Sequence, residues 1–172
     1  LDDLDLNPLL TLADSDGKPR FSPRSGRNEV PGTLDEQMIK DASSALDARE
    51  KTQLAYTIRN THRSVGTKLS SELTRRFGMR GLPPEHFTIR LRGTAGQSLG
   101  AFAVHGLKIV LTGDANDYVG KGLSGGTIVV KLATSSNLIS NENTIIGNTV
   151  LYGATEGKLF VAGQAGERFC VR

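Results

Sequence analysis

The chain has 172 residues, with 21 Lys or Arg against 18 Asp or Glu and one cysteine. This near balance gives no whole-chain field that would require nucleic acid as a partner. The single cysteine excludes an internal disulfide and any multi-cysteine metal or iron–sulfur site. No apolar run approaches the roughly 18 residues that cross a bilayer, and no signal-peptide pattern opens the chain. We expect a cytoplasmic protein, or one of the plastid stroma if the source is photosynthetic, with no membrane and no nucleic acid among its partners.

The first 32 residues carry turn formers such as Asn7-Pro8 and Pro31-Gly32 and show little periodicity. We expect residues 1–32 to form an extended connector that packs on the rest of the chain or on something else. The chain begins at Leu1 without a methionine and ends at Arg172 inside an apparent strand. We therefore also expect it to be part of a longer polypeptide.

We expect residues 33–82 to form a small α/β segment that begins with a helix. Thr33 and Glu36 have the spacing of a capping box, in which each side chain satisfies a backbone amide of the other residue. Apolar residues then recur every four positions, which predicts a helix over residues 34–47. The recurring residues are Leu34, Met38, Ala42 and Leu46.

The same segment continues with a strand and a second helix. Residues 53–59 alternate between apolar and polar, which predicts a strand with Leu54, Tyr56 and Ile58 on one face. A helix is expected over residues 65–77, burying Leu69, Leu73 and Phe77. Gly78 is placed to end that helix in a left-handed cap.

Between Arg59 and Arg92 the chain holds eight Lys or Arg against two Glu. We interpret these charges as solvated faces with a few contacts to a partner surface. Binding of phosphate or nucleic acid is the alternative, but no aromatic residues are interleaved with the charges to stack on bases.

From residue 83 onward the sequence repeats about every 20 residues. Residues 87–91, 107–111 and 127–131 are apolar strands 20 positions apart, and their register predicts that Ile89, Ile109 and Val129 stack inward. A fixed period of this size indicates units that bury their apolar faces only by stacking on one another. We expect a mainly β fold, with a right-handed parallel β-helix over residues 83–172.

Two interruptions are expected within this repeat. Residues 133–143 read as an inserted loop, after which the register resumes at residues 149–151 and 169–171. Secondary apolar stretches at residues 99–104 and 158–161 indicate more than one strand in each coil.

Glycines punctuate the repeat, because 14 of the 20 lie from Gly93 onward. Tight turns and backbone stacked on backbone both favour glycine, so we interpret these glycines as structural. Residues 163–166 repeat the spacing of residues 93–96, with Cys170 where a third glycine would stand. The structural glycines predicted in this way are Gly93, Gly96, Gly100, Gly120, Gly122, Gly125, Gly126, Gly153, Gly163 and Gly166.

Residues 120–125 also match the dinucleotide fingerprint GxGxxG. That fingerprint binds pyrophosphate only where it follows a strand and opens a helix. The next residues, 127–130, are β-branched and disfavour a helix, so we expect no cofactor there.

No catalytic, cofactor-binding or metal-binding residue is predicted in this chain. The three histidines, His62, His86 and His105, lie far apart in the sequence and are expected at the surface or in turns. Asp114, Asn116 and Asp117 resemble a turn with too few oxygen ligands for calcium. Cys170 is expected to be a small buried hydrophobic residue.

Long strings of this sequence resemble the C-terminal GXGXG domain of the glutamate synthase large subunit. The similar strings are residues 58–67, 93–102, 116–126, 146–155 and 165–169. The resemblance covers roughly residues 33–172, and residues 1–32 are similar only as the connector that follows the synthase domain. It implies a β-helix without catalytic residues that is fixed between a glutaminase domain and a flavin-containing synthase domain.

In that family, glutamine is hydrolysed at an N-terminal cysteine and ammonia travels through a tunnel to 2-oxoglutarate. The iminoglutarate formed there is reduced by FMN, and an iron–sulfur cluster supplies the electrons. The resemblance thus implies FMN and an iron–sulfur cluster in the whole oxidoreductase and none in this chain. Implied partners are the glutaminase and synthase domains of the same polypeptide, with a small electron-donating subunit or ferredoxin.

Two other functions stay open at this point. The β-helix also resembles a subunit of formylmethanofuran dehydrogenase, although residues 116–126 and 146–155 favour glutamate synthase. The second is an independent nucleotide-binding module that uses the loop at Gly120, which would need a helix after Gly125.

Overall fold

A computed structural model describes residues 4–10, 12, 14–22, 26 and 31–171. The chain divides into two units, residues 1–31 and residues 32–172. The described part of the first unit is exposed and contains a turn in which the amide of Leu9 donates to the carbonyl of Leu6. The rest of the predicted connector lies outside the described residues.

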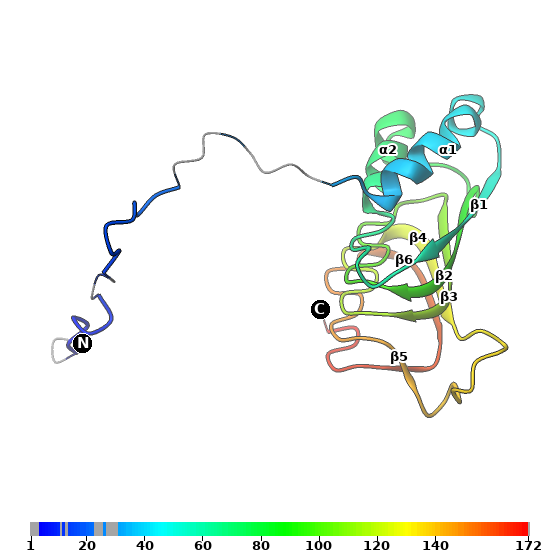
Figure 1. Cartoon of the computed structure of the whole chain (residues 1–172). Coiled ribbons are helices and arrows are strands. Elements are labelled where there is room, and N and C mark those ends of the chain that lie inside the picture. The colour runs from blue at the N-terminus through cyan, green and yellow to red at the C-terminus, as the bar shows by residue number, and fades with distance from the viewer. Residues whose placement is uncertain (1–3, 11, 13, 23–25, 27–30, 172) are drawn as a thin grey trace. The chain divides into compact units, whose positions relative to one another are not determined.

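The second unit combines two helices with a parallel sheet (Figure 1). None of the described helices is long and apolar enough to span a membrane. The elements are α1 (Leu34–Ala48), β1 (Thr52–Ile58), α2 (Thr67–Phe77), β2 (Phe87–Ala95), β3 (Leu107–Ala115), β4 (Ser124–Lys131), β5 (Thr144–Ile146), β6 (Glu156–Ala162) and β7 (Gln164–Ala165).

Helix α1 begins as the sequence predicts. The Thr33 hydroxyl accepts from the amide of Glu36, and the Glu36 carboxylate accepts from the amide of Thr33, so the capping box is present. Its apolar stripe is buried through Met38, Ala42 and Leu46.

The N-terminal cap of helix α2 could not be predicted from the sequence pattern. Its N-cap is Gly66, which has no side chain to offer. The buried carboxylate of Asp35, from α1, accepts instead from the amides of Gly66, Lys68 and Leu69 at 2.8, 2.7 and 3.1 Å. A carboxylate is favourable at this end of a helix because the free amides point toward it. Burial raises the pKa of Asp35 from its ordinary value, and the three amide bonds oppose that rise.

Helix α2 ends at Gly78, whose φ of 72° is positive but whose ψ of −172° is extended. The predicted left-handed cap is therefore wrong in its ψ angle. The Gly78 amide still donates to the carbonyl of Thr74 and closes the last turn.

All strand pairs in the sheet are parallel, in the order β1-β2-β3-β4-β6. The sheet includes β1, so residues 52–58 and 87–95 share one set of backbone hydrogen bonds. The fold class is mainly β, as the repeat predicts.

The inserted loop at residues 133–143 is confirmed, and the sheet shows what it interrupts. Strand β3 pairs with β4 through residues 108–112 and with β5 through Ala115. Strands β4 and β5 thus lie together along one neighbour, and the loop leaves and re-enters between them. Its residues are mostly exposed.

One predicted register position is wrong. Ile89 pairs with Ile109, and both are 1% exposed, but Ile109 pairs with Ile128 rather than with Val129. The step from β3 to β4 is one residue shorter than the step from β2 to β3. Because side chains alternate between faces, this shift turns Val129 outward and buries Ile128 completely.

The strand after β4 is also displaced from its predicted place. Residues 149–151 and 169–171 are turns and coil, and β6 pairs with β4 through residues 158–162 instead. The secondary apolar stretch at residues 158–161 is therefore the true continuation of the sheet.

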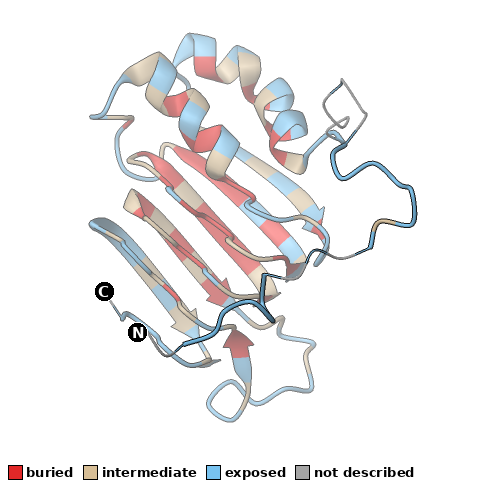
Figure 2. Cartoon of the chain, turned by 90° about the vertical axis from the view of Figure 1, so that its left-hand side faces the viewer, coloured by how far each residue is buried: buried red, intermediate tan, exposed pale blue. Residues whose placement is uncertain are grey.

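The core lies between the sheet, the turns that face it and the two helices. Figure 2 shows the helices across one end of the row of strands, with buried positions running through neighbouring strands. Met38 and Leu69 from the helices join Ile89, Ile109 and Ile128 in one apolar cluster. The order of the parallel strands therefore fixes where the turns between them lie.

Candidate functional site

The strands are linked by turns that stack on one another along one side of the sheet (Figure 1). We call this side the turn edge. Each of its turns has four residues, of which the third is apolar and is buried in the first four turns. The turns are residues 63–66, 97–100, 117–120, 148–151 and 167–170.

Backbone hydrogen bonds run between consecutive turns in both directions. The second residue of a turn donates to the next turn, as in Ser98 to the carbonyl of Asp117 at 2.8 Å. The fourth residue donates to the preceding turn, as in Gly120 to the carbonyl of Leu99 at 2.9 Å. The same two bonds recur at each step from the first turn to the last. The turn edge is thus a second hydrogen-bonded ladder beside the sheet.

These bonds require left-handed backbone at the second and fourth residue of every turn. Sequence reasoning found this conformation at Gly100 and Gly120 but missed it at residues without a glycine signal. Among those residues are Tyr118, Thr149 and Leu151, with φ of 63°, 56° and 60°. The spacing polar–any–apolar–Gly, shared by residues 97–100 and 117–120, was the available clue.

Polar side chains at the first position of the turns add a third set of bonds. An Asp117 carboxylate oxygen accepts from the amide of Asn148 at 2.8 Å, and the Asn148 amide oxygen accepts from the amide of Glu167 at 2.7 Å. At the start of the stack, the Arg63 guanidinium donates to the side-chain oxygen of Gln97. The Asp117 carboxylate therefore has a structural role, because it binds the backbone of the next turn.

The ten predicted glycines fall into two groups by conformation. Six have a positive φ, and four do not but leave less than 3.0 Å between an added Cβ and another atom. Their structural role stays a prediction that substitutions can test. The first group is Gly93, Gly100, Gly120, Gly122, Gly125 and Gly153, and the second is Gly96, Gly126, Gly163 and Gly166.

Gly96 shows how the second group differs from the expectation of a left-handed turn. Its φ is not positive, so backbone strain is not the reason for a glycine there. An added Cβ would instead overlap the carbonyl oxygen of Asn60 and lie 2.7 Å from that of His62. Close approach of the backbone just before the first turn is what excludes a side chain.

The GxGxxG string at residues 120–125 leads into strand β4 and not into a helix. The amides of Gly120 and Gly122 are already used, donating to the carbonyls of Leu99 and Tyr152 at 2.9 and 2.8 Å. The loop therefore lacks the helix N-terminus and the free amides with which that fingerprint holds a pyrophosphate.

The remaining candidate residues are dispersed. No group of three or more His, Cys, Asp or Glu residues within the described ranges is arranged to hold a metal ion. His62, His86 and His105 are partly exposed in different places; the His105 ring lies 3.1 Å from the Glu156 carboxylate.

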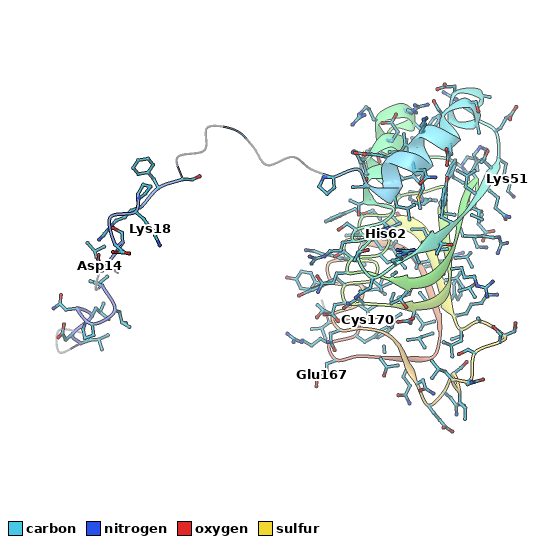
Figure 3. All side chains as sticks on the ribbon, viewed as in Figure 1. Asp14, Lys18, Lys51, His62, Glu167 and Cys170 are labelled. Carbon is cyan, nitrogen blue, oxygen red and sulfur yellow. The ribbon has the colours of Figure 1, made fainter. Side chains whose placement is uncertain are left out.

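Cys170 is exposed, which corrects the expectation of a buried hydrophobic residue. Figure 3 shows it with Glu167 on the turn edge. It occupies the fourth position of the last turn with φ of 54°, and its amide donates to the carbonyl of Val150 at 3.1 Å. Within the described residues no further turn stacks on it, so its side chain stays open.

Comparison with known proteins finds relatives of this chain. The chain is 67% identical over its full length to the glutamate synthase [NADPH] large chain of Azospirillum brasilense, of which the match covers 11%. It is 44% identical over 98% of its length to the glutamate synthase [NADH] of Saccharomyces cerevisiae, with 8% of that protein covered. The glutamate synthase [NADPH] large chain of Bacillus subtilis is 43% identical over 98% of the chain, with 11% covered.

The chain thus spans about a tenth of the length of the curated relatives it matches. A family model described as the GXGXG motif matches residues 35–172, which takes in every strand and both helices apart from Leu34. The resemblance noted from the sequence is confirmed over the same region. The chain belongs to the GXGXG motif family.

Proposed function

We propose that this chain is a non-catalytic structural domain of a glutamate synthase. It holds a glutaminase domain and an FMN-containing synthase domain of the same polypeptide in place while ammonia passes between them. The whole enzyme makes L-glutamate from L-glutamine and 2-oxoglutarate. The observation that carries this proposal is the 67% identity to a glutamate synthase large chain, combined with a turn edge whose amides are engaged by backbone.

The architecture that suits this role is a right-handed parallel β-helix from β1 onward. Its supports are the continuous parallel register and the turn edge, which together bond each coil to its neighbours along two sides. Right-handed crossover is the general rule between parallel strands of one sheet. Such a stack is quasi-one-dimensional, so it keeps two attached domains at a fixed separation.

The domain limits proposed from the sequence fit this role. Residues 1–32 serve as the connector, residues 33–82 as the small α/β segment and residues 83–172 as the main part of the stack. FMN and an iron–sulfur cluster belong to other parts of the enzyme. A small electron-donating subunit or ferredoxin supplies the electrons there.

The alternatives have less support. The relatives named above are glutamate synthases, which favours that assignment over the formylmethanofuran dehydrogenase subunit. The nucleotide-binding module lacks the helix after Gly125 that it needs.

Exposed Arg59 offers the test, because its side chain has no partner within the described part of the chain. In the full polypeptide, Arg59→Glu should lower glutamine-dependent glutamate formation more than ammonia-dependent formation. The matched control is Lys40→Glu on the exposed side of α1, which should leave the ratio of the two rates unchanged. Equal loss of both activities in Arg59→Glu, or loss of neither, would argue against the spacer role.

A further inference from the structure

The side of the sheet that faces away from the core has an unusual composition. We call it the outer face and define it by the residues that share three cross-strand rows on β1, β2, β3, β4 and β6. Five of its positions hold Lys or Arg and none holds Asp or Glu. The rows are Gln53, Thr88, Lys108, Thr127, Lys158; Ala55, Arg90, Val110, Val129, Phe160; and Thr57, Arg92, Thr112, Lys131, Ala162.

The cations of this face differ in whether they are neutralised. Lys108 pairs with Glu85 at 2.9 Å. Arg90, Arg92 and Lys131 are exposed, and their side chains make no ion pair or hydrogen bond with any residue that the structure describes. The nearest carboxylate further along β3 is that of Asp114, which accepts from the Thr94 hydroxyl at 2.8 Å.

These three cations surround an open hollow of about 560 Å³. Its lining includes Ala55 and Thr57, which have small side chains, and residues 132–135, which lead into the inserted loop. That loop also exposes two neighbouring apolar residues, Leu138 and Ile139, to 50% and 54%. Unpaired positive charge therefore lines the hollow, and the loop that leads away from it carries exposed apolar side chains.

The central row of the outer face, from Ala55 to Phe160, also combines positive charge with apolar side chains. Val110 is buried, but Phe160 at the end of the row is 56% exposed. Parallel sheets usually have both faces covered by other parts of the protein. An uncovered face with one sign of charge and an exposed aromatic side chain is typical of a surface that docks a partner.

We infer that the outer face docks an acidic surface from another domain of the full polypeptide, with carboxylates placed against Arg90, Arg92 and Lys131. This inference rests on the proposed function. Charge complementarity gives the sign of the partner, and the matched region is only about a tenth of the relatives' length, so the rest of such a chain supplies ample surface. Apolar contacts to Phe160 complete the interface.

A zero-length carbodiimide cross-linker tests this inference in the full polypeptide, because it joins an amine to a carboxylate only at ion-pair distance. After digestion, mass spectrometry should find Lys131 joined to an Asp or Glu outside these 172 residues. Exposed Lys40 on α1 is the matched lysine and should give only local products. Mixing ¹⁴N- and ¹⁵N-labelled protein shows whether the joined peptides come from one polypeptide.

The double variant Arg90→Glu and Arg92→Glu should reduce the Lys131 product by about tenfold, because like charges then face each other. Arg80→Glu is the matched control, since Arg80 is exposed and lies in the turn after α2. It should leave the product unchanged.

Three results would overturn the inference: Lys131 products confined to residues 32–171, products that join two copies, or a product that the double variant leaves intact. A polypeptide that forms glutamate yet gives one of these results retains the proposed function and loses only the docking face. A polypeptide that forms no glutamate from glutamine and 2-oxoglutarate would instead remove the proposed function.

Discussion

The turn edge and the outer face belong to the same run of parallel strands and turns, yet different atoms define them. Along the turn edge, backbone amides and carbonyls bond one turn to the next, and glycines admit the close approach. On the outer face, the backbone is already satisfied within the sheet, and the side chains carry the distinguishing feature, which is unpaired positive charge. The comparison indicates that changes on the turn edge should affect folding, whereas changes on the outer face should affect association.

The largest effect is expected for Gly96→Val. The new side chain would overlap the carbonyl oxygens of Asn60 and His62, just before the first turn, so we expect the free energy of unfolding to fall by about 3 kcal/mol or more. Lys158→Val on the outer face is the control and should change it by less than about 0.5 kcal/mol. Urea titration of both variants measures the difference, and equal midpoints would show that the turn edge is not held by close approach.

A smaller loss is expected for Asp35→Ala. The buried carboxylate binds the amide of Gly66 in the first turn and also caps α2. Its removal would leave three amide donors unpaired. We expect a loss of about 1–3 kcal/mol, with Asp35→Asn less harmful because it keeps one acceptor oxygen. Thermal unfolding followed by circular dichroism compares them. Identical melting temperatures for the alanine variant and the parent would contradict this account of the cap.

Thr149→Asn should raise the free energy of unfolding rather than lower it. A β-branched residue with φ of 56° is strained, whereas asparagine tolerates left-handed backbone. We expect the variant to be more stable by up to about 1 kcal/mol. A destabilised variant would mean that the threonine side chain has a role beyond its backbone conformation.

The smallest effect on folding is expected for Arg90→Glu in the 172-residue chain. Because the exposed Arg90 side chain has no partner among the described residues, its reversal should change the free energy of unfolding by less than about 0.5 kcal/mol. Chemical denaturation provides the measurement. A loss comparable to that of Asp35→Ala would show that the outer face stabilises the fold directly.

The helices and the parallel register were largely predictable because they rest on local patterns. The capping box at Thr33 and the alternation of residues 53–59 involve neighbours in the sequence, and both are present in the structure. The 20-residue spacing correctly paired Ile89 with Ile109. It misplaced Val129 because one shorter turn alters which face a residue occupies, and no composition signal marks that change.

The candidate sites were less predictable because they depend on contacts between distant residues. Gly96 is required by a carbonyl of Asn60, and Asp35 caps a helix that begins more than thirty positions later. Leu151 adopts left-handed backbone although leucine gives no hint of it. The outer face became visible only when the register showed which side chains share a row.

The central claim is that this domain keeps two reaction sites coupled without taking part in their chemistry. The most direct measurement follows the amide nitrogen in the full polypeptide, supplied with its electron donor, amide-¹⁵N glutamine, ¹³C-labelled 2-oxoglutarate and unlabelled ammonium. Glutamine hydrolysis also releases unlabelled glutamate, so only the glutamate that carries the ¹³C skeleton of labelled 2-oxoglutarate is counted. In that product the parent protein should incorporate ¹⁵N almost exclusively, and Arg59→Glu should raise the fraction without ¹⁵N while the ammonia-dependent rate stays the same. The same labelling ratio in both proteins, together with an equal fall in both rates, would contradict it.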